Sequence, residues 1–342
     1  MDSFQPRVQL NILPVLGGDC IHLRFQAADG WHNVIVDSGP AGGAGTFRTL
    51  LEQISVHGEC VDLLCFSHID DDHIKGAERV FTSVGFDPAI IRQIWLNVPD
   101  DSIPEKEING IYSTKTVTAA SKLLRAIVNH NIPFESKIIA GGEYRIGDAI
   151  IQVVLPTQER LNTYYTEWQE QFIKPVYQPQ ASHPDKSPTN GSSIALLCII
   201  GSRQILLTGD AFHSDLITVG NQYAGEQGFS LVKLPHHGSD ANISEEMLKA
   251  LKSQNFIIST RQTSQRPGQE AMKLISSYGS CYGDVTIYGN YEWPRYNSGL
   301  ANVKIVCPKC GGALTKDRIE VYSDAGSTQI YAEPICCSDP TE

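Results

Sequence analysis

The stretch "FSHIDDDHIKG" (residues 66–76) crowds two histidines and three consecutive aspartates behind an apolar run. Like charges at this spacing repel one another, so the cluster is costly alone and favourable around a bound cation. Imidazole nitrogens and carboxylate oxygens are the ligands that borderline and hard divalent metals take. The alternative is a polar turn before a helix, with Asp70 or Asp71 as its N-cap.

Two later stretches also end apolar runs with potential ligands. "LLTGDAFHSD" places Asp210 directly after a strand and a glycine, and "VKLPHHGSD" places His236 and His237 at another strand end. Asp210 alone is equally compatible with a turn that caps a helix. Adjacent histidines leave at least one ring in need of a partner, which favours a ligand role over a core role. Together, the three strand ends indicate a metal site.

The elements that must position these residues alternate between strands and helices. "VDLLCFSHI" is almost wholly apolar, as expected for a central strand buried on both faces. "GTFRTLLEQISVHG" has apolar residues at helical spacing, and "SEEMLKALKS" opens on Ser244 as a capping residue. We predict an α/β domain over residues 1–290, with helices layered over mixed sheets, and a small β-rich C-terminal extension over residues 291–342.

Composition limits the function classes. The chain has 342 residues, 41% hydrophobic and 19% charged, and a net charge of −11, which argues against a disordered chain and against coating nucleic acid through the overall field. An enzyme that takes phosphate esters stays compatible, because bound metal ions reverse the charge locally. The N-terminus lacks a signal-peptide pattern, and the longest apolar run, "IALLCII", is too short for a bilayer. We expect a cytoplasmic protein without a membrane partner.

In this order, the stretches resemble the metallo-β-lactamase-fold hydrolases. More narrowly, they are similar to the metallo-hydrolase domain of the ComEC competence proteins and its stand-alone relatives. The shared pattern spans roughly residues 8–290 and comprises "GD" (Gly18-Asp19), "IVDSG" (Asp37), "SHIDDDHIKG", an N-x-x-S (Asn190, Ser193), "LLTGD" and "PHHGS". This resemblance implies an αββα sandwich of two mixed β-sheets flanked by helices.

The resemblance also implies roles for single residues. The metal ligands would be His68 and Asp70 at a first site, Asp72, His73 and His236 at a second site, and Asp210 as the bridge. The catalytic group would be Asp72, Asp210 and His237, where His237 is either the late ligand itself or handles a proton or a phosphate oxygen. The candidate substrate-binding residues are Lys75, Asn190, Ser193, Ser239 and Arg266, and ordinary loop roles are the alternative for Lys75 and Ser239. Asp37 would order the site through hydrogen bonds, and Asp71 would face away.

Where many family members have a histidine before the paired strands, this chain has "SPTNGSS". The resemblance implies two divalent ions. Fewer nitrogen ligands weaken the case for tight zinc binding, so manganese and magnesium are alternatives to zinc. The implied activity is a nuclease or phosphodiesterase that uses a metal-bound hydroxide. The alternatives are hydrolysis of a small ester, amide or cyclic nucleotide, and a regulatory or binding module with a weakened site. The expected partner is nucleic acid or a small phosphoester or ester, and a protein partner is also compatible.

The C-terminal stretch contains a C-x-x-C-G knuckle of the kind that holds structural zinc. Its candidate ligands are Cys307, Cys310, Cys336 and Cys337. The second pair is irregular, because adjacent cysteines rarely bind one ion together. Free thiols are the alternative.

Overall fold

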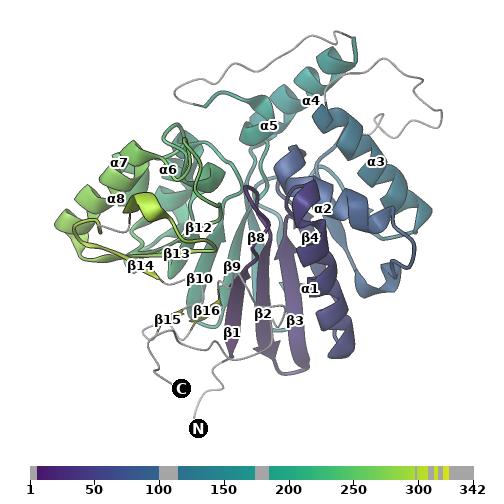
Figure 1. The fold of residues 1–342 in the computed structure, drawn as a ribbon, viewed down its shortest axis with the longest axis horizontal. Coiled ribbons are helices and arrows are strands. Elements are labelled where there is room, and N and C mark those ends of the chain that lie inside the picture. The colour runs from purple at the N-terminus through teal and green to yellow at the C-terminus, as the bar shows by residue number, and fades with distance from the viewer. Residues whose placement is uncertain are drawn as a thin grey trace.

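Two eight-stranded sheets pack face to face, and helices cover their outer faces (Figure 1). The computed structural model describes residues 6–99, 115–173, 185–296, 299–306, 312–314 and 319–322. The first sheet has the order β15-β16-β1-β2-β3-β4-β5-β6, and the second has the order β14-β13-β12-β11-β10-β9-β8-β7. Each sheet is mixed, because β3 to β6 and β10 to β14 are parallel runs, whereas β1 to β3 and β7 to β10 are antiparallel.

The strands of the first sheet are β1 (Val8–Ile12), β2 (Ile21–Ala27), β3 (Gly30–Val36), β4 (Leu63–Phe66), β5 (Ile94–Leu96), β6 (Phe134–Glu135), β15 (Gly312–Leu314) and β16 (Ile319–Tyr322). The strands of the second are β7 (Glu143–Ile146), β8 (Ala149–Leu155), β9 (Ala195–Ile200), β10 (Arg203–Leu207), β11 (Leu231–Lys233), β12 (Asn255–Ile258), β13 (Val285–Gly289) and β14 (Val303–Val306). The helices are α1 (Ala44–Val56), α2 (Asp71–Phe81), α3 (Lys115–Asn129), α4 (Gln158–Ile173), α5 (Pro188–Gly191), α6 (His213–Tyr223), α7 (Glu245–Leu251) and α8 (Gln269–Tyr282).

Strand β4 shows how the sequence builds this layering. Leu64 and Phe66 belong to the core under α1 to α3, whereas Leu63 and Cys65 belong to the core between the sheets. Side chains alternate between the faces of a strand, so an apolar run fills both cores. Full burial of a side chain the size of Phe66 contributes about 1.5–3 kcal/mol. The prediction of a central strand buried on both faces is confirmed.

The helices form for local reasons that the sequence shows. In α1, the apolar residues at helical spacing (Phe47, Leu50, Leu51 and Ile54) are all buried. In α7, the Ser244 hydroxyl accepts a hydrogen bond from the Met247 amide at 3.2 Å, as predicted for a capping residue. Helices α6 to α8 lie on the left of Figure 1 over the second sheet, α1 to α3 lie on the right, and α4 and α5 lie above.

The predicted fold class, an α/β sandwich of two mixed sheets flanked by helices, is confirmed. The stretch predicted as a C-terminal extension adds strands at one end of each sheet: β14 pairs with β13, and β16 pairs with β1 and with the edge strand β15. Across the described residues, no helix is both long enough and apolar enough to cross a membrane.

Candidate metal centre

The histidine and aspartate clusters meet where parallel strands end. Asp37 follows β3, His68 follows β4, Asp210 follows β10, and His236 follows β11. Parallel neighbours end at the same edge of a sheet, and that edge is where open α/β sheets bind their ligands. The two facing sheets therefore bring residues more than 160 positions apart in sequence to one place, as for His68 and His236.

Asp210 lies at the middle of the cluster. Its Oδ2 atom is 3.9 Å from His68 Nε2, 3.5 Å from His73 Nε2, 3.7 Å from His236 Nε2 and 3.8 Å from His237 Nε2. Two ligand atoms that share one ion at about 2.1 Å lie about 3.0–3.4 Å apart. The carboxylate and the four rings are thus spaced like ligands around cations, with little inward adjustment needed. Asp70 Oδ2 adds an oxygen 3.6 Å from His68 Nε2.

Each imidazole is held through Nδ1, so that Nε2 faces the middle. His73 Nδ1 donates to Asp37 Oδ2 at 2.8 Å, and His237 Nδ1 donates to the Ser259 carbonyl at 2.9 Å. His236 Nδ1 lies 2.8 Å from Asn242 Oδ1, and His68 Nδ1 lies 3.0 Å from Ser67 Oγ. An imidazole that donates through Nδ1 keeps the lone pair of Nε2 for a metal.

Buried polar atoms without a partner test whether a metal fits here. Among the described residues, the Nε2 atoms of His68, His73 and His237 and Oδ1 of Asp210 are buried and make no hydrogen bond. Burying such atoms unsatisfied is unfavourable, and four of them converging on one point is accounted for by a cation. The donor set of imidazoles and carboxylates fits a divalent metal. Asp19, His73, Asp210 and His237 each offer a ligand atom within 4.8 Å of the others.

The backbone is strained at this point. His236 and His237 have φ values of 50° and 56°, in the left-handed region that residues other than glycine rarely adopt. Two such residues in succession splay the adjacent rings, whose planes meet at 67°. Asp37 is also left-handed, with φ of 64°. Strain of this kind, about 1–3 kcal/mol per residue, concentrates at functional sites.

The two adjacent histidines have different neighbours. The resemblance implied that His236 is the metal ligand that joins Asp72 and His73 at the second site, with His237 as the alternative. In the structure, His237 is fully buried and its Nε2 atom lies 3.3 Å from Asp72 Oδ2. His236 is partly exposed and contacts the Arg266 guanidinium and Asp185 instead. The geometry therefore favours His237 as the ligand beside Asp72.

Lys233 and Asp19 are part of the cluster, although the sequence pattern indicated no role in it for either side chain. The Lys233 ammonium pairs with Asp19, lies 3.6 Å from Asp210 Oδ1 and donates to the Gly209 carbonyl at 2.8 Å. Asp19 Oδ1 in turn lies 3.1 Å from His237 Nδ1. The available signal was a single lysine inside the apolar run "LVKLP". A lysine is almost never fully buried unless it is paired.

Electrostatic coupling within the cluster is strong. Burial alone would lower the pKa of His73, but the carboxylates of Asp210 and Asp37 outweigh burial and raise that pKa well above its ordinary value. Burial would raise the pKa of Asp210, but His73 and His236 hold it well below its usual range. The acids thus stay ionised and draw cations, whether protons on the rings or a metal that displaces those protons.

The candidate substrate-binding residues separate into three groups. Asn190 and Ser193 support the cluster, because Asn190 Nδ2 donates to Asp185 at 2.7 Å and Ser193 Oγ accepts from the Asp210 amide at 3.1 Å. Lys75 pairs with Asp71 at 2.6 Å, and Ser239 Oγ accepts from the Ala241 amide, so both have local partners. Arg266 borders the cluster, with its Nη1 atom 3.9 Å from Asp72 Oδ2.

Asp185 and Asn242 hold His236 in place, and the sequence pattern indicated no role for either residue. Asp185 Oδ2 lies 3.2 Å from His236 Nδ1 and accepts from Asn242 Nδ2 at 3.1 Å. Both are common loop residues, and the sequence marks neither. The candidate zinc ligands Cys307, Cys310, Cys336 and Cys337 lie outside the described residues.

No family model matches the sequence, and no curated protein matches it. Solved structures do resemble it. The metallo-β-lactamase fold protein YhfI from Bacillus subtilis is 11% identical over 89% of this chain and 97% of its own, with a TM-score of 0.40. The diiron β-hydroxylase CmlA from Streptomyces venezuelae is 13% identical over 83% of this chain and 53% of its own, with a TM-score of 0.44. A diphosphatase of the PhnP family is 12% identical over 88% of this chain and 95% of its own, with a TM-score of 0.39.

Proposed function

We propose that this chain is a metal-dependent hydrolase that cleaves phosphodiester bonds in nucleic acid. The observation that carries the proposal is the convergence of four imidazole Nε2 atoms on one carboxylate oxygen, Asp210 Oδ2. Three of those atoms, on His68, His73 and His237, are buried and make no hydrogen bond to a described residue, which no purely structural role requires. The residues that would hold divalent ions are His68, Asp70, Asp72, His73, Asp210 and His237. Such ions would supply Lewis-acid activation of water and stabilisation of the developing negative charge.

Arg266 favours phosphorus over carbonyl substrates. Its guanidinium is 26% exposed and stands beside His236 and Asp72, at the solvent side of the cluster. A planar guanidinium pairs well with two oxygens of a phosphate. In this proposal Arg266 binds the non-bridging oxygens of the scissile group and orients it toward the cluster.

His236 has the place of a proton carrier. It is the most exposed of the four rings, and Asn242 and Asp185 hold its Nδ1 side. The Arg266 guanidinium donates to its Nε2 atom here, so His236 would hold a proton at Nε2 once a bound phosphate takes over Arg266, and would then deliver that proton to the leaving oxygen. This assignment exchanges the roles that the sequence suggested for His236 and His237.

The two protein cations favour a second candidate, a binding or regulatory module with a weakened site. Lys233 and Arg266 already offset part of the carboxylate charge, and Arg266 contacts the Nε2 atom of His236. Fewer metal ions are then needed for neutrality. This candidate predicts low metal occupancy and no turnover.

Metal analysis together with hydrolysis assays tests both candidates. Wild type, Asp72→Ala and Asp210→Ala are dialysed against manganese, magnesium or zinc, analysed for bound metal, and incubated with DNA, RNA and bis(4-nitrophenyl) phosphate. Asp71→Ala is the matched control, because Asp71 belongs to the same run but pairs with Lys75. We expect cleavage that requires Asp72 and Asp210 and survives Asp71→Ala. Absence of metal at this site would refute an enzymatic function, whether on nucleic acid or on a small ester. Cleavage of the small ester alone would favour a small-molecule hydrolase.

A further inference from the structure

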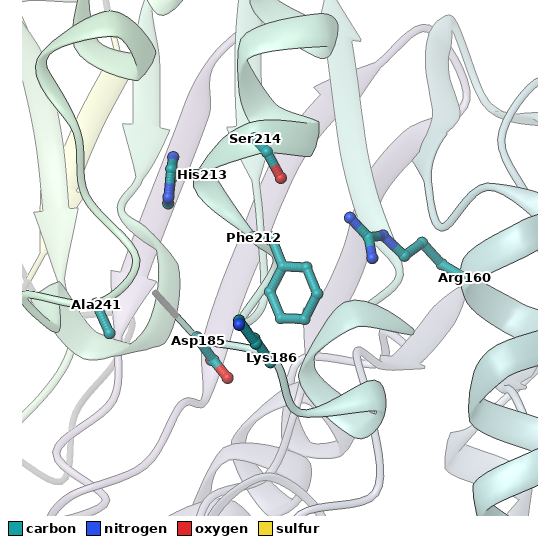
Figure 2. A pocket seen from close by; sticks show the side chains of 7 residues that line it. All are labelled: Arg160, Asp185, Lys186, Phe212, His213, Ser214 and Ala241. Atoms are coloured by element: carbon teal, nitrogen blue, oxygen red, sulfur yellow. The ribbon is translucent and has the colours of Figure 1, made fainter. Parts of the chain in front are cut away.

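A pocket of about 250 Å³ adjoins the metal centre. Its lining residues are Arg160, Asp185, Lys186, Phe212, His213, Ser214 and Ala241, and Figure 2 shows their side chains around it. Asp185 belongs both to this pocket and to the centre, because its Oδ2 atom lies 3.2 Å from His236 Nδ1. Phe212 follows Asp210 by two residues. The pocket is therefore within reach of one substrate molecule bound at the centre.

The acidic groups near the pocket are already engaged. Asp185 accepts hydrogen bonds from the Ser187 amide, Asn190 Nδ2 and Asn242 Nδ2, in addition to its contact with His236. These partners outweigh burial and lower the pKa of Asp185 to about 2. Asp215 accepts two hydrogen bonds from the guanidinium of the lining residue Arg160, at 2.9 and 3.0 Å.

The uncommitted groups of the pocket are hydrogen-bond donors or can become donors. Within the part of the chain that the structure describes, Lys186 has no ion-pair partner. Among the same described residues, His213 Nδ1 is a buried atom without a hydrogen bond, and Ser214, the next residue of α6, also lines the pocket. A cation, an imidazole and a hydroxyl together suit an anion rich in acceptor oxygens. In a chain of net charge −11, this local excess of donors is not a consequence of a basic surface.

An aromatic wall completes the pocket. The Arg160 guanidinium lies 4.7 Å from the centre of the Phe212 ring, and a side chain on Gly191 would come within 2.9 Å of that ring. The ring is thus confined from two directions and presents a fixed apolar surface. The volume is below the roughly 300–1,000 Å³ of pockets for drug-sized ligands. It suits one phosphate with part of the attached sugar or base.

We infer that this pocket binds a second phosphate of the substrate, adjacent in the chain to the phosphodiester at the metal centre. This inference rests on the proposed function and narrows it, because it gives the enzyme a preference for oligonucleotides over esters with a single phosphate. Lys186 and His213 hold the flanking phosphate, and the Phe212 ring packs against its sugar or base.

The first test measures binding without turnover. Thymidine 5′-phosphate, thymidine and inorganic phosphate are titrated by calorimetry in EDTA into wild type, Lys186→Gln and Arg266→Gln. Lys249→Gln is the control, because Lys249 is an exposed lysine of α7 that pairs with Glu245 and does not line the pocket. We expect the nucleotide to bind more tightly than thymidine, Lys186→Gln to weaken its binding about tenfold, Arg266→Gln to weaken it less than Lys186→Gln does, and Lys249→Gln to leave it unchanged. Binding lost in Arg266→Gln and kept in Lys186→Gln would place the anion at the centre and overturn the inference.

The second test measures the KM for cleavage of dithymidine phosphate with and without a 5′- or 3′-terminal phosphate. We expect the terminal phosphate to lower KM, and Lys186→Gln to reduce that KM ratio about tenfold, as the loss of one charged hydrogen bond does. An unchanged ratio, with inorganic phosphate bound as tightly as the nucleotide, would mean a site for free phosphate and would overturn the inference. If no diester is cleaved, the proposed function fails, while the binding test still decides whether Lys186 holds a phosphate.

Discussion

The buried Lys233 offers a direct test of how the centre is held together. Its side chain is 2% exposed, at the end of β11, and its ammonium contacts two buried carboxylates, Asp19 and Asp210. Burial alone would lower the pKa of Lys233, but Asp19 and Asp210 outweigh burial and raise it. Lys233→Met keeps most of the aliphatic volume and removes the charge together with the hydrogen bond to the Gly209 carbonyl. Both carboxylates would then lose their permanent protein cation.

The expected loss follows from the distances. At 3.6 Å and an effective dielectric constant of about 20, the attraction between Lys233 and Asp210 is about 5 kcal/mol, before the desolvation of the ammonium is subtracted. Removing one partner of a buried pair destabilises a protein by about 3–5 kcal/mol, because the other charge is left uncompensated. We therefore expect Lys233→Met to lower the free energy of unfolding by about 3–5 kcal/mol in EDTA.

Urea denaturation at pH 7 in EDTA measures this loss for Lys233→Met, Asp19→Asn and the double variant. The double variant is expected to lose at least about 1 kcal/mol less than the sum of the two single losses, because it removes both charges of one pair. Saturating manganese or zinc is expected to restore part of the stability of Lys233→Met, since the metal supplies the missing positive charge. Lys273→Met, at an exposed lysine paired with Glu270, is the control and is expected to change stability by less than about 0.5 kcal/mol.

A loss below about 1 kcal/mol for Lys233→Met, or strictly additive single variants, would contradict this account. In that case the ammonium would contribute nothing net to the fold. The charge of the two carboxylates would then have to be balanced by protons on the neighbouring rings.

Three further predictions concern residues around the centre. A side chain on Gly18 would come within 1.9 Å of the Asp72 carbonyl oxygen, whereas no atom of the described residues lies within 4 Å of one on Gly17. Gly18→Ala is therefore expected to lower the free energy of unfolding by about 1–3 kcal/mol and to weaken metal binding, and Gly17→Ala to do neither. Equal effects of the two substitutions in urea denaturation would refute the packing argument. Burial lowers the pKa of His22 from 6.5 to about 4, so the unfolded chain takes up this proton first as the pH falls. Wild type should therefore lose about 2 kcal/mol more stability than His22→Gln between pH 7 and pH 4.5, and parallel pH profiles would contradict this. Asp37→Asn, which weakens the hold on His73 Nδ1, is expected to reduce metal affinity about 10- to 100-fold in a competition assay with a chelator, and unchanged affinity would show that the ring needs no such support.

Local patterns predicted much of the fold. Apolar runs such as that of β4 predicted a buried strand, the helical spacing of α1 predicted its buried face, and Ser244 predicted the start of α7. These features depend on neighbours within a few residues, so they can be read without knowing the rest of the chain. The same locality explains why the histidines and aspartates that follow β4, β10 and β11 could be recognised as a cluster.

The order of residues shows which types end those strands, and therefore that the fold must accommodate carboxylates and imidazoles there. How these groups pair depends on the packing of the two sheets. The left-handed backbone at His236 and His237 turns the second ring, rather than the first, toward Asp72. The ion pair of Lys233 with Asp19 and the contact of Arg266 with His236 join segments far apart in the chain. Such contacts depend on sheet packing and on the direction of each side chain, neither of which is encoded within a few residues of the contact itself.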